Sequence, residues 1–584
     1  MPNIFGIFQT GVSGLMVSQA GIDVTGHNIA NVNTEGYSRQ RLSIETEIPL
    51  LIHPGPFGRG AKVSSVLRTY DDVLAKNLRD STSNLRYYES LQQSLESVET
   101  YFNELEAGSG LGDALKEYFN AWSDLSNTAP DKSDEATVKR VTLIEKSETL
   151  IQKIHDGYQS IEEVRNRSDE NIKEYVKEIN DLAENIAYYN FQIAKTETGG
   201  DHANDMRDKR ELLLNKMSEL VNIKTFERED GQMSVFIGGI AIVDGSTANS
   251  LYAVENDEND GHYDIYWGAH LIDKAQVNIT DKISSGRMYA ELKARDDVLK
   301  GYQNTLDEFA KNLILKTNQI HSLGQGLKRF SQITSTNGVE NPSYKFSEDP
   351  GKLQYDINKG VFRITVYNSD GLKTDDFDIE VDPSKDSLNS IIEKISQADG
   401  NAGGGIIQAY LSEGGKLKIQ VKDGYTFSFS EDNSNILAAL GMYGYFKGTD
   451  AKTIELNDIV KNDNSFIATS KTGEPGDNQI ALAISNLKFN EVFDEKGVTF
   501  DQFYTTFVSQ IASDKKQVDT FVDAKKEAVN QLTLKLDEVK GVSLDEEFTN
   551  LIKFQKAYEA NARFITAVDE MLDRLINGTG TVGR

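Results

Sequence analysis

The segment at residues 28–40 reads NIANVNTEGYSRQ and places amide, hydroxyl, carboxylate, phenol and guanidinium groups close together. These residue types could form a catalytic loop, a phosphate cradle or a turn that directs a helix. The segment contains no Cys and no His. Nucleophilic or metal-based chemistry would therefore need partners from elsewhere in the chain.

The rest of the chain offers few such partners. The seven histidines are scattered, and no two have helical metal-ligand spacing: His27, His53, His155, His202, His262, His270 and His321. The chain has no Cys, which excludes disulfides, thiolate metal sites and Cys nucleophiles. The stretch GSGLGD, residues 108–113, does not follow a predicted strand, so it does not match a dinucleotide fingerprint. We therefore expect no catalytic residues, no metal and no cofactor.

The nearest approach to a cation site is the acidic segment at residues 256–261. Gly261 lies where an EF-hand loop has its glycine, but Trp267 occupies the position of the bidentate Glu. We interpret the segment as a solvated acidic turn.

Length and charge set wider limits. A chain of 584 residues is too long for one core, so several domains are expected. A formal charge of -29 disfavours binding to nucleic acid and anionic membranes. No run approaches the 18 apolar residues of a membrane span. The opening residues lack the basic and apolar regions of a signal peptide, which predicts a cytosolic protein or export without a cleaved leader.

The first predicted helix covers residues 4–30. An apolar residue recurs every seven positions, which is typical of a coiled coil: Phe8, Leu15, Ile22 and Ile29. Five glycines lower the intrinsic stability of this helix by about 1 kcal/mol each. It is either a surface helix with small residues for close packing or a helix that orders when neighbouring chains pack on it.

The segment at residues 28–40 then acquires a structural interpretation. Asn28 and Asn31 lie at the predicted helix end, while Asn33 and Gly36 supply turn chemistry. Tyr37 begins a predicted extended arm. We expect a helix terminator and a hinge, with polar groups satisfied locally or by adjacent subunits.

The last predicted helix opens with Ser543 and Glu546, which match a capping box. Two apolar stripes follow. One contains Phe548, Leu551, Tyr558, Ala562, Ile565 and Leu572; the other contains Phe554, Phe564, Val568, Met571 and Leu575. A surface helix needs only one stripe, so we expect the first helix to cover one and another subunit to cover the other. A groove in the helical domain is the alternative.

The predicted fold class is α+β and multidomain, with a discontinuous, nested layout. It combines coiled-coil-like terminal helices, a bundle of long helices and β-rich inserts, including a short helix near residues 387–396. The expected domains are residues 1–60 with 541–584, residues 61–221 with 284–327 and 457–540, residues 222–283, and residues 328–456.

Several segments resemble a known family. GVSGLMVSQAGIDVTGHNIANVNTEGYSRQ resembles the N-terminal signature of the axial proteins of bacterial flagella, which form rod, hook and hook-associated structures. GVSLDEEFTNLIKFQKAYEANARFITAVDEMLDRLIN resembles their terminal helix, and NDMRDKRELLLNKMSELVNI and ARDDVLKGYQNTLDEFA resemble internal segments. Ser-Arg-Gln after Tyr37 is most similar to the hook-associated members at the hook–filament junction.

The resemblance implies an extracellular structural subunit exported through the flagellar type III apparatus. It implies a homo-oligomer, with the hook protein and a second junction protein as neighbours. It also implies an export chaperone on the C-terminal helix, with no nucleic acid and no membrane insertion. Two alternatives stay open: a hook or distal-rod protein, and a secreted adhesin-like protein acting through the β-rich insert. Four aromatic residues motivate the second if they face solvent, although core packing is the favoured interpretation: Tyr425, Tyr443, Tyr445 and Phe446.

Overall fold

The computed structural model describes residues 4–52, 55–102, 110–128, 133–199, 201–268, 277–348, 353, 355–400, 405–474, 476–493 and 496–578. The fold is α+β with long helices at both ends, as predicted. The chain forms two compact units: residues 1–94, 166–295 and 516–584 in unit 1, and residues 95–165 and 296–515 in unit 2. Three helices contribute to both units: α2 (Asp72–Phe102), α4 (Asp134–Glu197) and α12 (Phe500–Lys540). These two units are defined by contacts within the chain, whereas the four predicted domains were defined by their helix or strand content. The division into four domains therefore stays a prediction.

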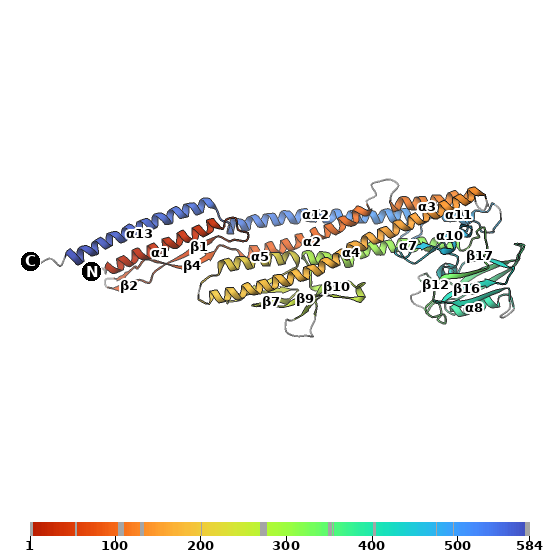
Figure 1. Ribbon diagram of the computed structural model, residues 1–584, viewed down its shortest axis with the longest axis horizontal. Coiled ribbons are helices and arrows are strands. Elements are labelled where there is room, and N and C mark those ends of the chain that lie inside the picture. Colours follow the sequence, from red (N-terminus) through yellow and green to blue (C-terminus); the bar gives the residue numbers. More distant parts are fainter. Residues whose placement is uncertain are drawn as a thin grey trace, which may run out of the picture. The chain divides into compact units, whose positions relative to one another are not determined.

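Unit 1 begins and ends with a pair of helices, α1 (Ile4–Ala30) and α13 (Leu544–Gly578) (Figure 1). The two run antiparallel, because Gly11 faces Ile565 while Gly21 faces Phe554. An antiparallel hairpin, which we call the arm, follows α1. Its strands are β1 (Gln40–Thr46), β2 (Leu50–Ile52), β3 (Gly55–Phe57) and β4 (Ala61–Arg68). The arm also packs against α1.

The body of unit 1 packs helices against two small antiparallel sheets. The helices are α5 (Asn204–Leu220) and α6 (Gly286–Lys293), with the C-terminal part of α4. One sheet contains β5 (Lys224–Glu227), β6 (Met233–Ile237), β7 (Ile240–Asp244) and β8 (Thr247–Ala248). The other contains β9 (Ser250–Glu255), β10 (Tyr263–Gly268) and β11 (Val277–Asn278). An apolar row of α4, from Ile172 to Ile186, lies in their common core.

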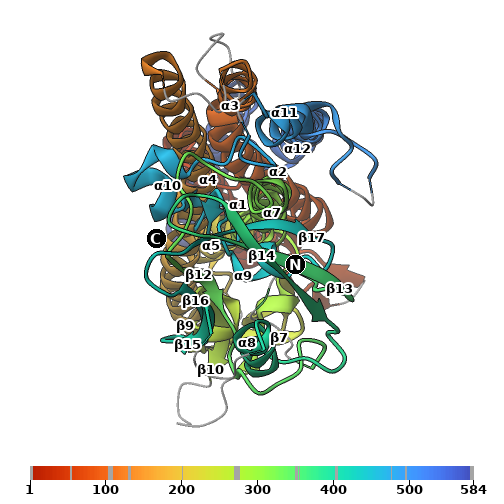
Figure 2. The same cartoon turned by 90° about the vertical axis from the view of Figure 1, so that its right-hand side faces the viewer.

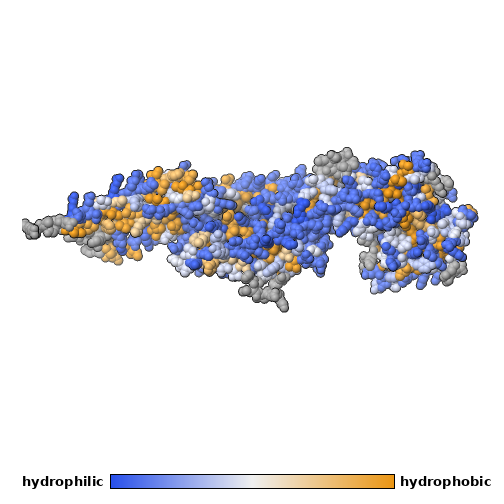
Figure 3. Space-filling model, viewed as in Figure 1, coloured by the Kyte–Doolittle hydropathy of each residue, from blue (hydrophilic) through white to orange (hydrophobic). Residues whose placement is uncertain are grey.

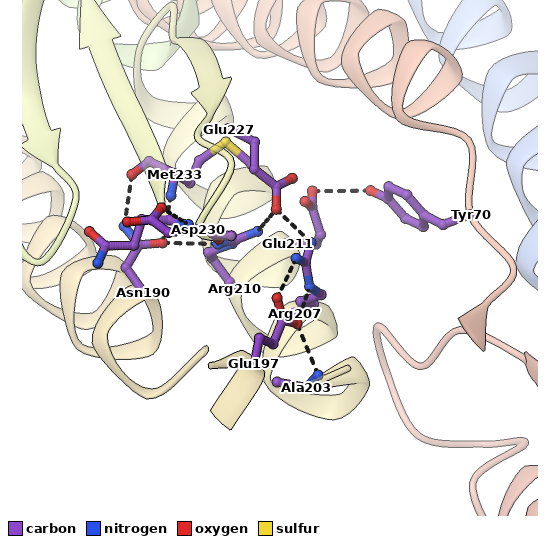
Figure 4. Close-up of polar contacts among 12 residues, drawn as sticks. Tyr70, Asn190, Glu197, Ala203, Arg207, Arg210, Glu211, Glu227, Asp230 and Met233 are labelled. Atoms are coloured by element: carbon purple, nitrogen blue, oxygen red, sulfur yellow. Dashed lines mark hydrogen bonds and ion pairs between the residues drawn. The ribbon is translucent and has the colours of Figure 1, made fainter. Parts of the chain in front are cut away.

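Asn190 interrupts that apolar row for a structural reason. Its Oδ1 accepts from the Met233 backbone N–H at 3.0 Å, and its Nδ2 donates to the carbonyls of Met233 at 2.7 Å and Gly245 at 2.6 Å. A buried polar group of this kind is tolerated only when its hydrogen bonds are satisfied. The amide therefore fixes the first sheet to α4 (Figure 4).

Unit 2 combines helices with the β-rich insert. Its helices are α3 (Leu111–Ser126), α7 (Leu299–His321), α8 (Leu388–Gln397), α9 (Ile436–Leu440), α10 (Asp458–Asn462) and α11 (Gln479–Asn486). Its strands are β12 (Gln332–Gly338), β13 (Gly360–Tyr367), β14 (Lys373–Val381), β15 (Ile407–Ser412), β16 (Lys416–Val421), β17 (Thr426–Asp432), β18 (Phe446–Lys447) and β19 (Glu455–Leu456). They form the sheets β12-β16-β15, β14-β13-β17 and β18-β19. The short helix α8, capped by Ser387, packs against strands of both larger sheets (Figure 2).

The aromatic residues that motivated the adhesin-like alternative do not face solvent. Tyr443, Tyr445 and Phe446 are buried, and Tyr425 is half-buried. Tyr445 packs on Trp122 and Tyr118 in the core of unit 2. Core packing, the favoured interpretation of these residues, is therefore confirmed for Tyr443, Tyr445 and Phe446, and the adhesin-like alternative loses the observation that motivated it.

The same core holds a neutral histidine. His321 is fully buried; its Nδ1 donates to the Tyr443 carbonyl oxygen at 2.9 Å, and its Nε2 accepts from the Ala468 backbone N–H at 2.9 Å. Burial lowers the pKa of His321 to about 4, and the nearby Arg140 cation contributes in the same direction. Both ring nitrogens are satisfied in the neutral form, so protonation would break the bond from Ala468.

We expect this histidine to make unit 2 acid-sensitive. An unfolded His takes up a proton below about pH 6.5, whereas folded His321 does so only near pH 4, so stability is lost as the pH falls through that window. Between about pH 7 and about pH 5 the loss is about 2 kcal/mol. Urea unfolding at both pH values measures it. His321→Gln, which keeps a donor and an acceptor, should show a smaller pH dependence; an unchanged dependence would contradict this assignment.

Candidate assembly site at the ends of the chain

The surface of α1 that faces α13 is lined by small residues. They are Gly11, Gly14, Ser18, Gly21 and Thr25, in steps of three and four. A Cβ placed on Gly21 would lie 2.4 Å from Phe554, and one on Gly11 would lie 2.7 Å from Ile565. The glycines thus let bulky side chains of α13 approach the α1 backbone.

This row differs from the one that the sequence predicted. The apolar heptad residues lie next to the contact row and are half-buried: Phe8, Leu15, Ile22 and Ile29. Spacing of seven predicted the helix but not the face in contact, because small residues allow the closest approach of the two helices. The predicted coiled-coil seam is therefore displaced around the helix.

The residues of α13 that lie against the α1 glycines come from both predicted stripes and include a polar residue: Phe554, Asn561, Phe564 and Ile565. Val568 is fully buried, and other members of the predicted stripes are half-buried: Leu551, Phe554, Ala562, Ile565 and Leu572. Other members stay exposed on the flanks: Phe548, Tyr558, Phe564, Met571 and Leu575. The grouping into two stripes was wrong, because the contact advances in mixed steps of three and four. The expectation that α1 covers only part of the apolar surface holds within this chain (Figure 3).

A buried polar group closes the base of the helix pair. Asn28, 1% exposed, donates through Nδ2 to the Gln40 carbonyl oxygen at 2.9 Å and to Glu547 Oε2 at 3.0 Å. Its Oδ1 accepts from the Tyr37 hydroxyl at 2.7 Å and from the Gln40 backbone N–H at 2.9 Å. The amide therefore makes four hydrogen bonds, its full capacity. It joins the end of α1 to the arm and to the start of α13.

Arg39 completes this connection. Its Nε donates to Glu547 Oε1 at 2.8 Å, its Nη2 lies 2.7 Å from the same oxygen, and its Nη1 donates to Glu546 Oε2 at 2.7 Å. Its backbone N–H donates to the Lys540 carbonyl oxygen at the end of α12, at 2.9 Å. We call Asn28, Tyr37, Arg39, Gln40 and Glu547 the base cluster. It fixes both terminal helices to the first residues of the arm.

Helix α5 supports the base cluster with a row of carboxylates. Asp205 accepts from Gln40 Nε2 at 2.7 Å, and Asp208 accepts from the Ser38 backbone N–H at 2.8 Å and from Arg68 at 3.2 Å. Burial raises the pKa of Asp208, although the bond from Ser38 and the Arg68 cation oppose this. Burial, reinforced by Asp205, Asp208 and Glu547, also raises the pKa of Tyr37, so its hydroxyl stays a donor.

Other side chains of α5 fasten it to the body of unit 1 (Figure 4). Arg207 binds both oxygens of Glu197, at 2.7 and 2.8 Å, and also reaches Glu227. Arg210, fully buried, donates to Asn190 Oδ1 at 3.0 Å and to the Gly231 carbonyl oxygen at 2.6 Å. Glu211 accepts from the Tyr70 hydroxyl at 3.0 Å. These contacts make α5 a rigid support for the ends of the chain.

The predicted terminator is present. Helix α1 ends at Ala30, Asn31 hydrogen-bonds the His27 carbonyl oxygen, Asn33 is exposed, and Gly36 has a φ of +79° that favours glycine. The polar groups around Tyr37 find partners within the same chain, which is one of the two expected arrangements, and the hinge stays a prediction. The predicted capping box is also absent from the hydrogen bonds of the described residues, where Glu546 pairs with Arg39 and not with Ser543.

Sequence reasoning missed Arg39, Glu547 and the carboxylates of α5 as parts of this site. One signal was available, since Asp205, Asp208 and Glu211 recur every third residue and so lie along one side of a helix. Nothing in the sequence indicates that this side faces the segment at residues 28–40.

The described residues show little that could perform chemistry. No group of three His, Asp or Glu side chains within them is arranged to hold a metal ion. The acidic segment near Gly261 is a hairpin turn, in which Asn256 Oδ1 accepts from the Glu258 backbone N–H at 3.0 Å. His53, His270 and Gly108 lie outside the described residues. Nor does any helix in the described ranges have the length and apolar character needed to cross a bilayer.

Comparison with known families finds matches at both ends and in the helical body. The family "Flagellar hook-associated protein FlgK helical domain" matches residues 95–332. "Flagella basal body rod protein" matches residues 8–37, and "Flagellar basal body rod FlgEFG protein C-terminal" matches residues 537–578. The two rod-family matches therefore cover most of α1 and all of α13, and they include Asn28, Tyr37 and Glu547 of the base cluster.

Individual proteins match over the whole length. Flagellar hook-associated protein 1 of Bacillus subtilis is 25% identical and covers 100% of both chains, and that of Escherichia coli is 24% identical and covers 98% of this chain and 99% of its own. Among solved structures, the flagellar hook junction protein FlgK of Burkholderia pseudomallei matches with a TM-score of 0.51. It has 16% identity and covers 80% of this chain and 100% of its own. That structural likeness concerns the fold.

Proposed function

Since this chain belongs to the FlgK family of flagellar hook-associated proteins, we propose that it is a structural subunit of the junction between hook and filament. Its terminal helices self-assemble into the axial structure, and its other domains face solvent. The protein performs no catalysis in this role.

The observation that carries the proposal is the incomplete cover of the terminal helix pair. Helix α1 packs on one row of α13, yet large apolar side chains on the flanks of α13 stay exposed, among them Phe548, Phe564 and Met571. A soluble monomer rarely leaves such a row uncovered, so a further copy is the natural partner. In a subunit that assembles through its ends, these residues are buried by neighbouring copies.

The proposed partners follow from the same role. The hook protein lies below the junction, and a second junction protein lies above it. Before assembly, an export chaperone holds α13 and covers its exposed apolar flanks. The protein leaves the cell through the flagellar type III apparatus and functions outside it.

A charge in the α1–α13 contact should block assembly. Leu551→Asp and Ile565→Asp each place a carboxylate among apolar side chains of the pair, which costs several kcal/mol unless the helices separate. We expect motility and filament attachment to be lost while the central domains stay folded. Gln555→Asp, at an exposed position of the same helix, is the control. A normal junction containing either contact variant would refute the packing claim.

A deletion strain tests the place in the flagellum. Electron microscopy of such cells should show complete hooks without filaments. Missing hooks would favour a hook or distal-rod protein instead. Labelled microscopy of purified hook–basal bodies carrying the tagged wild-type protein then locates the subunit directly.

A further inference from the structure

The arm ends in a small apolar surface that this chain leaves uncovered. Leu51 is 81% exposed and Ile48 71%, and Leu50 and Phe57, which pair across β2 and β3, are also exposed. We call these four residues the arm tip. Two-stranded hairpins are marginally stable alone, and an apolar hairpin end in water is an unusual surface for a monomer.

A second uncovered apolar surface runs along one flank of α13. It contains Phe564, Met571 and Leu575, at spacings of seven and four, and Met571 is 51% exposed. We call this row the α13 flank. It adjoins the α1–α13 contact, because the edge of the Phe564 ring and the neighbouring Ile565 lie against Gly11 of α1, and Val568 beside them is fully buried. An apolar partner seated there would extend an interface that already exists.

The arm and α13 contact different sides of α1. The arm touches α1 through Arg59, which donates to Gln9 Oε1 at 2.8 Å, and through Ala61, whose N–H donates to Ser13 Oγ at 3.2 Å. Helix α13 touches the glycine row instead. Figure 1 accordingly shows α1 between α13 and the arm.

The two uncovered surfaces also lie at the same level along α1. Arm residues 59–61 and α13 residues 564–565 both lie beside α1 residues 9–13. Phe57 lies three residues beyond Gly60, or about 10 Å further toward the end of the arm at the rise of extended chain. The same distance along α13, at the helical rise per residue, corresponds to about seven residues beyond Ile565. The arm tip is therefore level with Met571 and Leu575.

We propose that the arm tip of one copy packs on the α13 flank of the neighbouring copy. The inference rests on the proposed function, because it requires an assembly of copies side by side. Two different surfaces of one subunit make a head-to-tail contact, which repeats around a ring or helix and never closes as a pair. Because the two surfaces lie at the same level along the axis of α1, a neighbouring copy displaced laterally brings its α13 flank against the arm tip.

The absence of cysteine from the chain makes a crosslinking test clean. Flagella are purified from cells whose only copy carries Leu51→Cys with Met571→Cys, and the sample is oxidised and run without reductant. We expect a ladder of covalent oligomers. Cells that carry the two substitutions on separate copies should give dimers but no longer products. A matched pair, Leu51→Cys with the exposed helix position Leu534→Cys, should give monomers.

Four outcomes would overturn the inference. Dimers from Leu51→Cys alone would mean that arm tips meet each other, and a ladder from the Leu534 control would mean that crosslinking is unspecific. Assembled flagella that contain the protein but give no ladder would refute the contact and leave the junction role intact. Absence of the protein from purified flagella would refute the junction role and the contact together.

Discussion

Gly21→Ala is expected to separate the terminal helices, although the same change would stabilise an isolated helix by about 1 kcal/mol. The new Cβ would lie 2.4 Å from the Phe554 ring, and two further ring atoms lie within 2.7 Å. A rigid ring packed against the helix backbone cannot yield by a small rotation. Helix α13 must therefore move outward or Phe554 must leave the contact, and overpacking of this kind typically costs 1–3 kcal/mol.

Gly26→Ala provides a matched control on the same helix. A Cβ at Gly26 meets nothing within 4 Å, so this variant gains helix propensity without a clash. Hydrogen exchange of residues 4–30 and 544–578 in the purified chain should rise in Gly21→Ala and fall in Gly26→Ala. Flagella should lose filaments only in Gly21→Ala. Equal exchange in the two variants would show that the glycines serve helix flexibility and not close packing.

The glycines illustrate what the sequence reveals about the ends of this chain. Periodicity predicted α1 at residues 4–30, where the structure has it, and placed one helix opposite another. It failed to identify the face in contact, because a search for large apolar residues overlooks glycine and serine. The α13 stripes failed for a related reason: a helix with apolar residues on several sides does not reveal which of them meets a partner.

The base cluster was predicted only in part. Residues 28–40 were recognised as a turn with polar groups to satisfy, since that information is local. Arg39 and Glu547 stand 508 positions apart, and no spacing rule joins two residues so distant. The spacing of the α5 carboxylates likewise indicates that they share one face of a helix, but it does not indicate which part of the chain packs against that face. Such pairs depend on how the ends of the chain return to one another, which only the fold supplies.

Glu547→Gln is expected to disconnect α13 from the arm. The Glu547 carboxylate is 2% exposed and accepts from both Asn28 and Arg39. A glutamine of nearly the same volume keeps the packing but removes the charge and turns one acceptor into a donor that faces other donors. Breaking a buried ion pair on one side costs 3–5 kcal/mol, and the partial exposure of Arg39 reduces this to about 2–4 kcal/mol.

Glu546→Gln separates this effect from the general loss of a charge near Arg39. Glu546 binds the same guanidinium at 2.7 Å, but it is 62% exposed, so its removal should cost less than about 1 kcal/mol. Urea unfolding measures both variants, and hydrogen exchange at the Arg39 amide, which is bonded to Lys540, reports on the base cluster itself. Fast exchange in Glu547→Gln with slow exchange in Glu546→Gln would establish the buried carboxylate as the connection. Equal losses of stability in the two variants would instead show that the net charge near Arg39 holds α13 to the arm. The burial of Glu547 would then make no special contribution.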